Sequence, residues 1–449
     1  MPLLSICLGF FIVMLDTTIV NLAIADIGRQ LHAGVTLLQW VLDAYTLVFA
    51  AFLLSAGALG DGLGARRVFL AGLLLFCVTS AACAMAPTGL ALVAARALQG
   101  LAAAILVPTS LALINATYSE RSERARAIGI WGGMGGIAAA AGPVLGGVLI
   151  TAAGWRTVFL VNVPVTLLAF ALVRAFVVDP PRREGVGIHD YAGQVLAVAS
   201  LALVTYAVIE GAGGRAGVVT LACLVAGIAL AVVFVVVEAR AAQPMFPVGL
   251  LRQGSFSGAV STGLLLNLGF YGQLFVLSLY FQQLRGYAPL VAGFLIVPQT
   301  ATAIVGSTLG GRVTARTGPP LPIVIGLTVG AAGFAGLLLV GARTSYALIL
   351  LPMIAAGLGT AFTMPAATAA AIEAAPRERA GAAAGVLNTG RQVGSVLGVA
   401  VLGGVIANGQ PFVPGFHAAV LGAAAAFTLA IAVNLATWPG RVLMRSVRT

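Results

Sequence analysis

The stretch LLSICLGFFIVMLDTTIVNLAIADI, residues 3–27, is a long apolar run interrupted by a carboxylate at Asp16. About 20 apolar residues are enough for an α-helix to cross the hydrocarbon core of a bilayer. A charge at that depth is costly, so proteins retain one mainly where it faces a cavity and acts on an ion or proton. The stretch therefore predicts an integral membrane protein with a polar pathway.

The composition of the whole chain supports this class. The chain is 60% hydrophobic and 8% charged, whereas soluble domains are about 25% charged. Its net charge of +11 comes from arginine alone and lies in short gaps between apolar runs. We therefore expect contact with membrane lipid and not with nucleic acid. The four cysteines have neither zinc nor disulfide spacing, so neither a metal nor another cofactor is expected.

Apolar runs between polar or Gly/Pro breaks predict fourteen membrane-spanning helices. They are expected at residues 3–27, 36–59, 67–86, 89–116, 126–152, 156–177, 191–210, 216–238, 256–283, 288–311, 320–341, 345–372, 380–407 and 416–438. An even number places both termini on one side of the membrane. Seventeen arginines fall on that side and five on the other, so both termini are predicted to be cytoplasmic.

The two longest connections, 178–190 and 239–255, flank the seventh and eighth spans. This spacing predicts an all-α membrane fold of two six-helix bundles, residues 1–177 and 256–449, with two extra helices within 178–255. An internal repeat supports the division, because GALGDGLGARR after the second span is similar to GRVTARTGPP after the tenth.

The first copy of that repeat, residues 57–67, is expected to form a tight cytoplasmic turn. Gly57 and Gly64 permit the reversal of the chain. Asp61, Arg66 and Arg67 offer charges that can pair with neighbouring helix ends and form a conformational latch. The alternative is a solvated basic turn that only follows the positive-inside rule.

GALGDGLGARR resembles the loop signature of the major facilitator superfamily, G-x-L-[AG]-D-[RK]-x-G-[RK]-[RK], except at Gly62 and Ala65. Further segments are similar to the fourteen-helix drug:proton antiporter branch, the EmrB/QacA-like proteins. They are LDTTIVNLAIADI (15–27), ARALQGLAAAILVP (95–108), AGPVLGGVL (141–149), WRTVFLVNVPV (155–165) and ERAGAAAGVLNTGRQVGSVLGVAVLG (378–403). The resemblance implies the major facilitator fold and a secondary active transporter rather than an enzyme. It implies export of hydrophobic or cationic small molecules, such as drugs or antibiotics, in exchange for protons by alternating access.

Three charged residues within predicted spans are candidates for proton coupling: Asp16, Arg96 and Asp43. Burial disfavours a charged carboxylate and a nearby arginine favours it, so movement of Arg96 relative to Asp16 can control proton binding. The resemblance also assigns the position of Arg96 to proton coupling. The alternatives are a static buried ion pair for Asp16 and Arg96, and a water-exposed residue near a helix end for Asp43.

The fifth predicted span contains Gly142, Pro143, Gly146 and Gly147. This pattern predicts a kink and close packing against the opposite bundle. The resemblance implies that it is the antiporter motif, a hinge or seal that limits leak. Ordinary helix packing is the alternative.

A substrate cavity is expected to include Asn21, Gln99, Tyr271, Gln299 and Arg391, where Arg391 has either a substrate contact or a packing role. Such residues suit apolar or cationic compounds without identifying one. An uptake transporter for a metabolite and a non-transporting receptor or scaffold are the alternative functions. We expect a monomer in the cell membrane, with protons and a small molecule as its partners.

Overall fold

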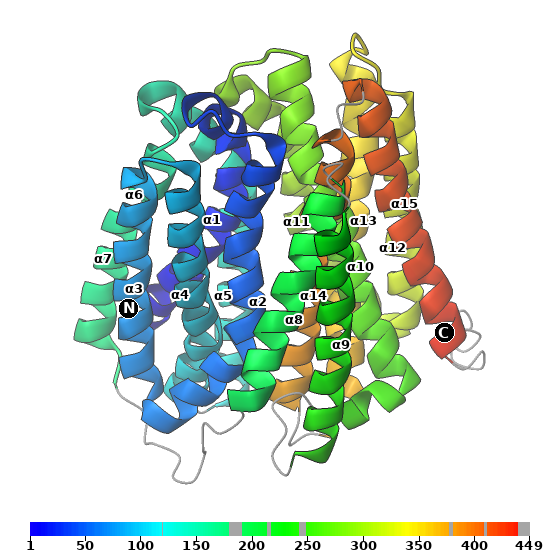
Figure 1. Cartoon of the computed structure of the whole chain (residues 1–449). Coiled ribbons are helices and arrows are strands. Elements are labelled where there is room, and N and C mark those ends of the chain that lie inside the picture. Colours follow the sequence, from blue (N-terminus) through cyan, green and yellow to red (C-terminus); the bar gives the residue numbers. More distant parts are fainter. Residues whose placement is uncertain are drawn as a thin grey trace. The chain divides into compact units, whose positions relative to one another are not determined.

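The computed structural model describes residues 1–118, 120–178, 191–212, 217–241, 248–376, 380–407 and 411–438, and every regular element in these ranges is a helix (Figure 1). Fourteen helices among them are long and apolar enough to cross a membrane. The predicted number of spans is therefore confirmed.

The chain divides into two compact units. The N-terminal unit comprises Met1–Val198 and Tyr287–Leu295, and the C-terminal unit comprises Ala199–Gly286 and Ile296–Thr449. The predicted division into two bundles and two extra helices stays a prediction.

The N-terminal unit contains α1 (Pro2–Gln30), α2 (Val35–Leu63), α3 (Ala65–Met85), α4 (Gly89–Thr117), α5 (Arg121–Ala153), α6 (Thr157–Leu160), α7 (Asn162–Phe176) and the first turns of α8 (Tyr191–Ala212) and α11 (Pro289–Thr317). Helices α6 and α7 form one span that breaks at Val161. Pro164 has no N–H to donate to the carbonyl of Leu160, which explains a break at this place.

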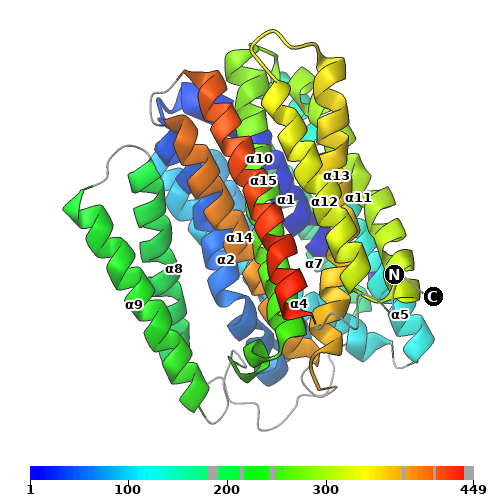
Figure 2. The same ribbon diagram turned by 90° about the vertical axis from the view of Figure 1, so that its right-hand side faces the viewer.

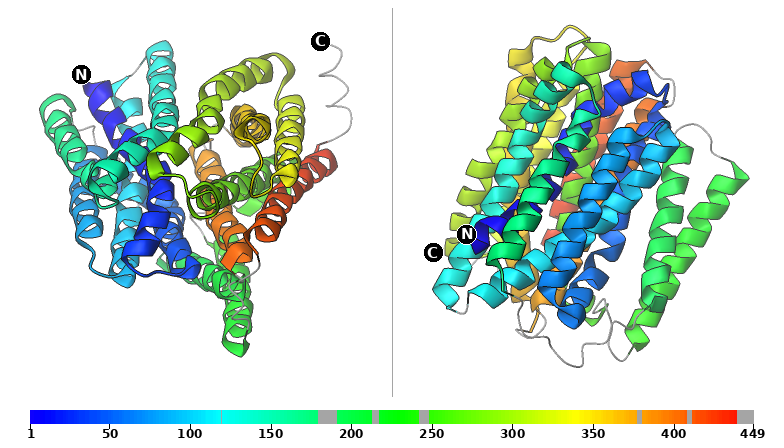
Figure 3. Two further views of the ribbon diagram at one scale, coloured as in Figure 1. Left: turned by 90° about the horizontal axis from the view of Figure 1, so that it is seen from above. Right: turned by 90° about the vertical axis from the view of Figure 1, so that its left-hand side faces the viewer.

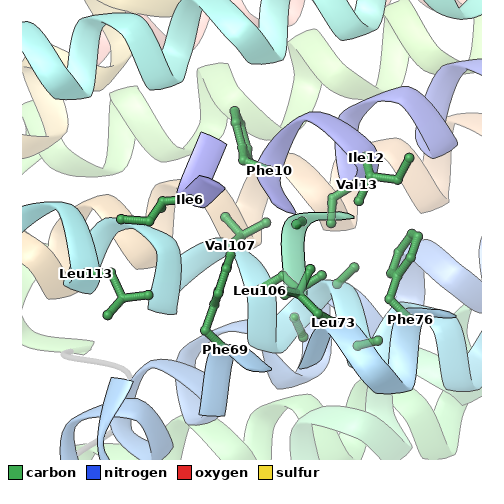
Figure 4. Close-up of a cluster of buried hydrophobic side chains, with 14 of the residues drawn as sticks. Ile6, Phe10, Ile12, Val13, Phe69, Leu73, Phe76, Leu106, Val107 and Leu113 are labelled. Carbon is green, nitrogen blue, oxygen red and sulfur yellow. The ribbon is translucent and has the colours of Figure 1, made fainter. Parts of the chain in front are cut away.

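The core of the N-terminal unit lies among α1, α3 and α4. Phe10 and Val13 from α1 pack with Phe69 from α3 and with Leu106 from α4, and all four are buried (Figure 4). Lipid tails are as apolar as these side chains, so van der Waals contact rather than the hydrophobic effect holds the helices together. The packing is close, since a Cβ atom on Gly72 would lie 2.8 Å from Ile105.

The C-terminal unit contains the rest of α8 and α11, with α9 (Val218–Arg240), the 3-10 turn η1 (Val248–Arg252), α10 (Gly254–Leu279), the π-helical turn η2 (Tyr280–Leu284), α12 (Pro320–Gly336), the 3-10 turn η3 (Leu337–Leu339), α13 (Tyr346–Glu373), α14 (Ala380–Ala407) and α15 (Phe412–Thr437). Helices α12 and α15 lie side by side, as the end-on view shows in yellow and red (Figure 3).

Glycines bring α10 and α14 into backbone contact. A Cβ atom on Gly394 would lie 2.0 Å from the carbonyl oxygen of Leu264, and one on Gly398 would lie 2.2 Å from that of Leu268. Real Cβ atoms do not approach so closely, so this seam requires residues without a side chain.

Helices α8 and α9 run side by side (Figure 2). Only 6% of the most apolar stretch of α9 is buried inside the protein, so most of this helix is available to lipid. The first turn of α8 is hydrogen-bonded to α2 within the N-terminal unit. Gln194 Nε2 donates to the carbonyl of Ala51 at 2.9 Å, and Gln194 Oε1 accepts from Ser55 Oγ.

Candidate functional site

A buried ion pair joins α1 to α4. Arg96 Nη1 donates to Asp16 Oδ2, and the two side chains are 1% and 0% exposed. The other carboxylate oxygen, Oδ1, accepts from Gln99 Nε2 at 3.1 Å and from Asn162 Nδ2 at 2.9 Å. Asp16 therefore receives donors from three side chains on two other helices, α4 and α7.

Ser80 of α3 closes this network. Its hydroxyl accepts from Gln99 Nε2 at 2.8 Å and from Asn162 Nδ2 at 3.3 Å. Gln99 also accepts from Arg96 Nη1 at 2.7 Å. The four helices α1, α3, α4 and α7 thus contribute to one continuous set of hydrogen bonds around Asp16.

The remaining faces of the Arg96 guanidinium are covered by α2 and α6. Its Nε donates to the carbonyl of Val41 at 3.1 Å. Its carbon Cζ lies 4.2 Å from the ring centre of Tyr45 and 5.7 Å from that of Phe159, within range for cation–π attraction. The charge is therefore removed from lipid and water but is well partnered.

The local sequence of α4 explains how Arg96 reaches these partners. Gln99 and Gly100 follow Arg96 by three and four residues and so lie on the same helical face. A Cβ atom on Gly100 would lie 2.2 Å from the carbonyl oxygen of Tyr45. The missing side chain lets α4 approach α2 closely, which places the guanidinium against Val41 and Tyr45.

Sequence reasoning singled out Asp16, Arg96 and Gln99 but missed Asn162 and Ser80 as members of this network. The sequence gives a reason to consider Asn162, because it is a polar residue within the apolar segment WRTVFLVNVPV. The sequence gives no such reason for Ser80, since a single serine is common in a membrane span.

Asp43, the third proposed coupling residue, lies apart from these contacts. It is buried on α2, and its Oδ2 has no hydrogen-bond partner in the described part of the chain. It is two residues from both Val41 and Tyr45, which places it on the opposite face of α2 from Arg96. Its coupling role stays a prediction.

The 57–67 segment forms a joint between α2 and α3. Only Gly64 separates these helices, and its φ of 99° is one that glycine adopts readily. A Cβ atom on Gly57 would lie 3.6 Å from the Cβ atom of Pro108 on α4. Arg66 Nη2 donates to the carbonyl of Arg174 at 2.8 Å, in the last turn of α7, while Arg67 is exposed. The side chain of Asp61 lies outside the described residues, so the latch stays a prediction.

The glycine-proline run of α5 packs between α1 and the start of α11. A Cβ atom on Gly142 would lie 2.0 Å from Thr18 Oγ1, and one on Gly146 would lie 3.0 Å from Ile19. On the side of α11, a Cβ atom on Gly147 would lie 2.7 Å from the Cα of Leu290. On the same side, a Cβ atom on Gly293 of α11 would lie 2.2 Å from the carbonyl oxygen of Pro143.

The five residues proposed for a substrate cavity are divided between the units. In the N-terminal unit, Gln99 belongs to the Asp16 network and Asn21 Nδ2 donates to the carbonyl of Thr17 at 3.0 Å. In the C-terminal unit, Gln299 and Gln273 exchange amide hydrogen bonds, of which the shorter is 2.7 Å. Tyr271 and Arg391 lie on α10 and α14.

Comparisons with known proteins agree with this architecture. The family profile described as Major Facilitator Superfamily matches residues 6–399. The multidrug resistance protein Stp of Mycobacterium tuberculosis is 38% identical over 408 residues, which cover 91% of this chain and 76% of Stp. The methylenomycin A resistance protein of Bacillus subtilis is 34% identical over 434 residues, covering 95% of this chain and 92% of that protein. The tetracenomycin C resistance and export protein of Streptomyces glaucescens is 35% identical, covering 90% and 76%.

Among solved structures, a bacterial homologue of the human lysosomal transporter Spinster in an inward-facing, unoccupied conformation superposes with a TM-score of 0.71. The alignment covers 99% of this chain and 97% of that one at 15% identity. At that identity the likeness shows the fold alone, which is the predicted one.

Proposed function

This chain belongs to the major facilitator superfamily, and we propose that it couples export of small molecules to inward movement of protons through Asp16 and Arg96. It is a drug or antibiotic efflux transporter of the fourteen-helix branch and not an enzyme. The predicted family, fold and class of function are thereby confirmed. Proton coupling, the roles of individual residues, the monomeric state and the cytoplasmic location of both termini are proposals.

The hydrogen bonds of Asp16 are the observation that carries the coupling proposal. An ionised carboxylate can only accept hydrogen bonds, and Asp16 receives N–H donors from Arg96, Gln99 and Asn162. A proton on Asp16 would remove the negative charge that holds Arg96. Proton binding and the ion pair therefore exclude one another.

This exclusion supplies a coupling step. When the helices separate Asp16 from Arg96, the carboxylate loses its charged partner in an apolar surrounding and takes up a proton from outside. When Arg96 returns, the ionised form is again favoured and the proton leaves toward the cytoplasm. The contacts that change lie on α1 and α4, while α2, α3, α6 and α7 supply the other partners.

The contact between α5 and α1 offers a path from this step to the seal. Thr18 lies two residues after Asp16 on α1, and its hydroxyl group faces Gly142 directly. A rotation or shift of α1 that separates Asp16 from Arg96 also moves Thr18 against α5. The same run of α5 contacts Leu290, so closure of the seal and the protonation of Asp16 are mechanically linked in this proposal.

Asp16→Asn tests the proposal, because asparagine keeps the size of the side chain and is always neutral. We expect loss of efflux driven by a pH gradient, with downhill exchange of substrate retained. Efflux of a fluorescent drug from energised vesicles should be recorded together with proton flux.

A static ion pair predicts a different result. In that case the variant would accumulate to a lower level, but each surviving molecule would still couple efflux to protons. The double variant Asp16→Asn with Arg96→Gln provides the control, since it removes both charges. Recovery of pH-driven efflux in the double variant would contradict the coupling role of Asp16.

A further inference from the structure

A second arginine lies inside a membrane span, and it has no acidic partner in the part of the chain that the structure describes. Arg391 is half-buried and lies well within the span Ala382–Ile406. Its Nη2 contacts Met364 Sδ at 3.0 Å, and its Nε is buried without a hydrogen-bond partner among the described residues. A thioether is a weak acceptor, so the positive charge is left uncompensated.

The spans from α10 to α15 carry no acidic residue except Glu373 at the very end of α13, and the other acids of the C-terminal unit's spans, Glu210 and Glu238, lie on α8 and α9. Between residues 254 and 438 the only acids are Glu373 and Glu378. Glu373 is the exposed last residue of α13, and Glu378 lies outside the described residues. An arginine at membrane depth is expensive and is normally paired, which points to an anion that α10 to α15 do not themselves supply.

One face of α10 lies beside Arg391. Gly263, Asn267 and Tyr271 follow one another at intervals of four residues and therefore share this face. A Cβ atom on Gly263 would lie 2.9 Å from Arg391 Cγ, so the glycine leaves room for the arginine stem. One turn on, Asn267 Nδ2 donates to Ser395 Oγ at 3.1 Å. The next residue on this face, Tyr271, lies within electrostatic reach of the Arg391 charge.

Tyr271 offers a hydroxyl donor and an aromatic ring near Arg391. Its side chain is partly buried on α10, and its hydroxyl group can donate to an incoming oxygen. Its ring meets that of Phe270 edge to face, with ring centres 5.4 Å apart. A guanidinium N–H and a phenol O–H near an aromatic pair suit an ionised acid carried on an apolar body.

We propose that Arg391 and Tyr271 bind the anionic oxygen group of an exported compound, such as a carboxylate or a phenolate. This inference rests on the proposed function and narrows its substrate class to apolar compounds that carry an acid. It replaces the expectation of a cationic substrate with an anionic one. Arg391 holds the charge, and Tyr271 orients the group.

Three dyes with one xanthene body test the charge preference: carboxyfluorescein as the acid, a neutral rhodol ester and cationic rhodamine 6G. Binding is measured by fluorescence anisotropy on the purified protein in phosphatidylcholine nanodiscs, which does not require transport. Wild-type protein should prefer the acid. Arg391→Gln should weaken binding of the acid by about tenfold or more, since hydrogen bonds to charged groups are among the stronger ones, and should leave the neutral ester unchanged.

Arg391→Lys keeps the charge and should retain part of the preference for the acid. Tyr271→Phe should weaken acid binding by a smaller factor. Arg343→Gln is the matched control, because it removes one arginine charge from an exposed loop between α12 and α13. It should bind all three dyes as wild type does.

Two further arms identify the source of the anion. Acid binding is also measured with added sodium chloride and with phosphatidylglycerol in the nanodisc. If these anions lower acid binding at Arg391, and the protein binds the acid no better than the neutral ester without them, the site holds an inorganic anion or a lipid phosphate. The substrate proposal is then wrong. Equal binding of the acid to wild type and Arg391→Gln would also overturn it. Efflux of the three dyes from vesicles tests the proposed function separately, because acid binding at Arg391 can be present when proton-coupled efflux is not.

Discussion

Arg96 and Arg391 both lie within membrane spans, but their surroundings differ. Arg96 has a carboxylate, a side-chain amide, a backbone carbonyl and two aromatic rings around it. Arg391 has one thioether and an unpartnered Nε. A fully partnered arginine can take part in an internal switch, whereas an arginine with unfilled donors is prepared for a ligand.

Each unit also contains a pair of helices that glycines bring into close contact, so the two units can be compared at similar packing. In the N-terminal unit α5 presses glycines against α1, with Gly142 on Thr18 and Gly146 on Ile19. In the C-terminal unit α14 presses Gly394 and Gly398 against α10. The acid that α1 carries at Asp16 has no counterpart on α10, whose sequence contains no acidic residue. The two units thus combine one packing scheme with two electrostatic arrangements.

The largest contrast is expected in stability. Arg96→Gln leaves Asp16 buried without its charged partner, and breaking a buried pair in this way costs about 3–5 kcal/mol. Arg391→Gln removes a charge that has no acidic partner, so we expect little loss or a small gain. Thermal unfolding of the two purified variants in one detergent checks this. Equal losses would contradict the difference between the two arginines.

Removing one donor to Asp16 should have a smaller effect. Asn162→Ala takes away an N–H that bonds a carboxylate, and hydrogen bonds to charged groups contribute about 1.5–3 kcal/mol. Asn267→Ala in the C-terminal unit removes a bond to a neutral hydroxyl, worth about 1 kcal/mol. Thermal unfolding should rank the two variants in this order, and pH-driven efflux should fall only in Asn162→Ala.

The two glycine seams can be compared by adding one methyl group to each. Gly142→Ala and Gly394→Ala place a Cβ atom 2.0 Å from Thr18 Oγ1 and from the Leu264 carbonyl, respectively. Overpacking of this kind costs about 1–3 kcal/mol, so both variants should lose stability. Only Gly142→Ala should increase proton leak without substrate, because its neighbour Thr18 lies two residues after Asp16 in α1. Leak in both variants, or in neither, would separate the seal from the coupling site.

The smallest stability effect is expected at the α2–α3 joint. Asp61→Asn changes one charge near the membrane surface, where ion pairs contribute about 0–1 kcal/mol. Folding and membrane insertion should therefore stay near normal. If Asp61 is part of a latch, the efflux rate at equal protein level should still fall, as measured in vesicles. An unchanged rate would leave the solvated-turn interpretation.

The spans and the central ion pair could be predicted from the sequence because apolar runs stand out from polar connections, and charged residues stand out within apolar runs. A carboxylate such as Asp16 or a guanidinium such as Arg96 is conspicuous in an apolar run, and each needs a partner. Asn162 is conspicuous in the same way, but its pairing with Asp16 and the role of Ser80 could not be predicted, since pairing across helices depends on helix rotation and depth, which the sequence pattern does not give. The polarity of Gln99 predicts a cavity residue, and its bonds to Asp16 and Ser80 form only once α1, α3 and α4 are packed.

The missing acid beside Arg391 has an electrical consequence. If an anion leaves the cell while one proton enters, each cycle carries two positive charges inward. Moving one elementary charge through 100 mV is worth about 2.3 kcal/mol, so the membrane voltage alone would contribute about twice that to each turnover. Such a pump would work without any pH difference, and a potassium diffusion potential across proteoliposomes would be enough to drive it. A cationic cargo exchanged for one proton would draw nothing from the same voltage.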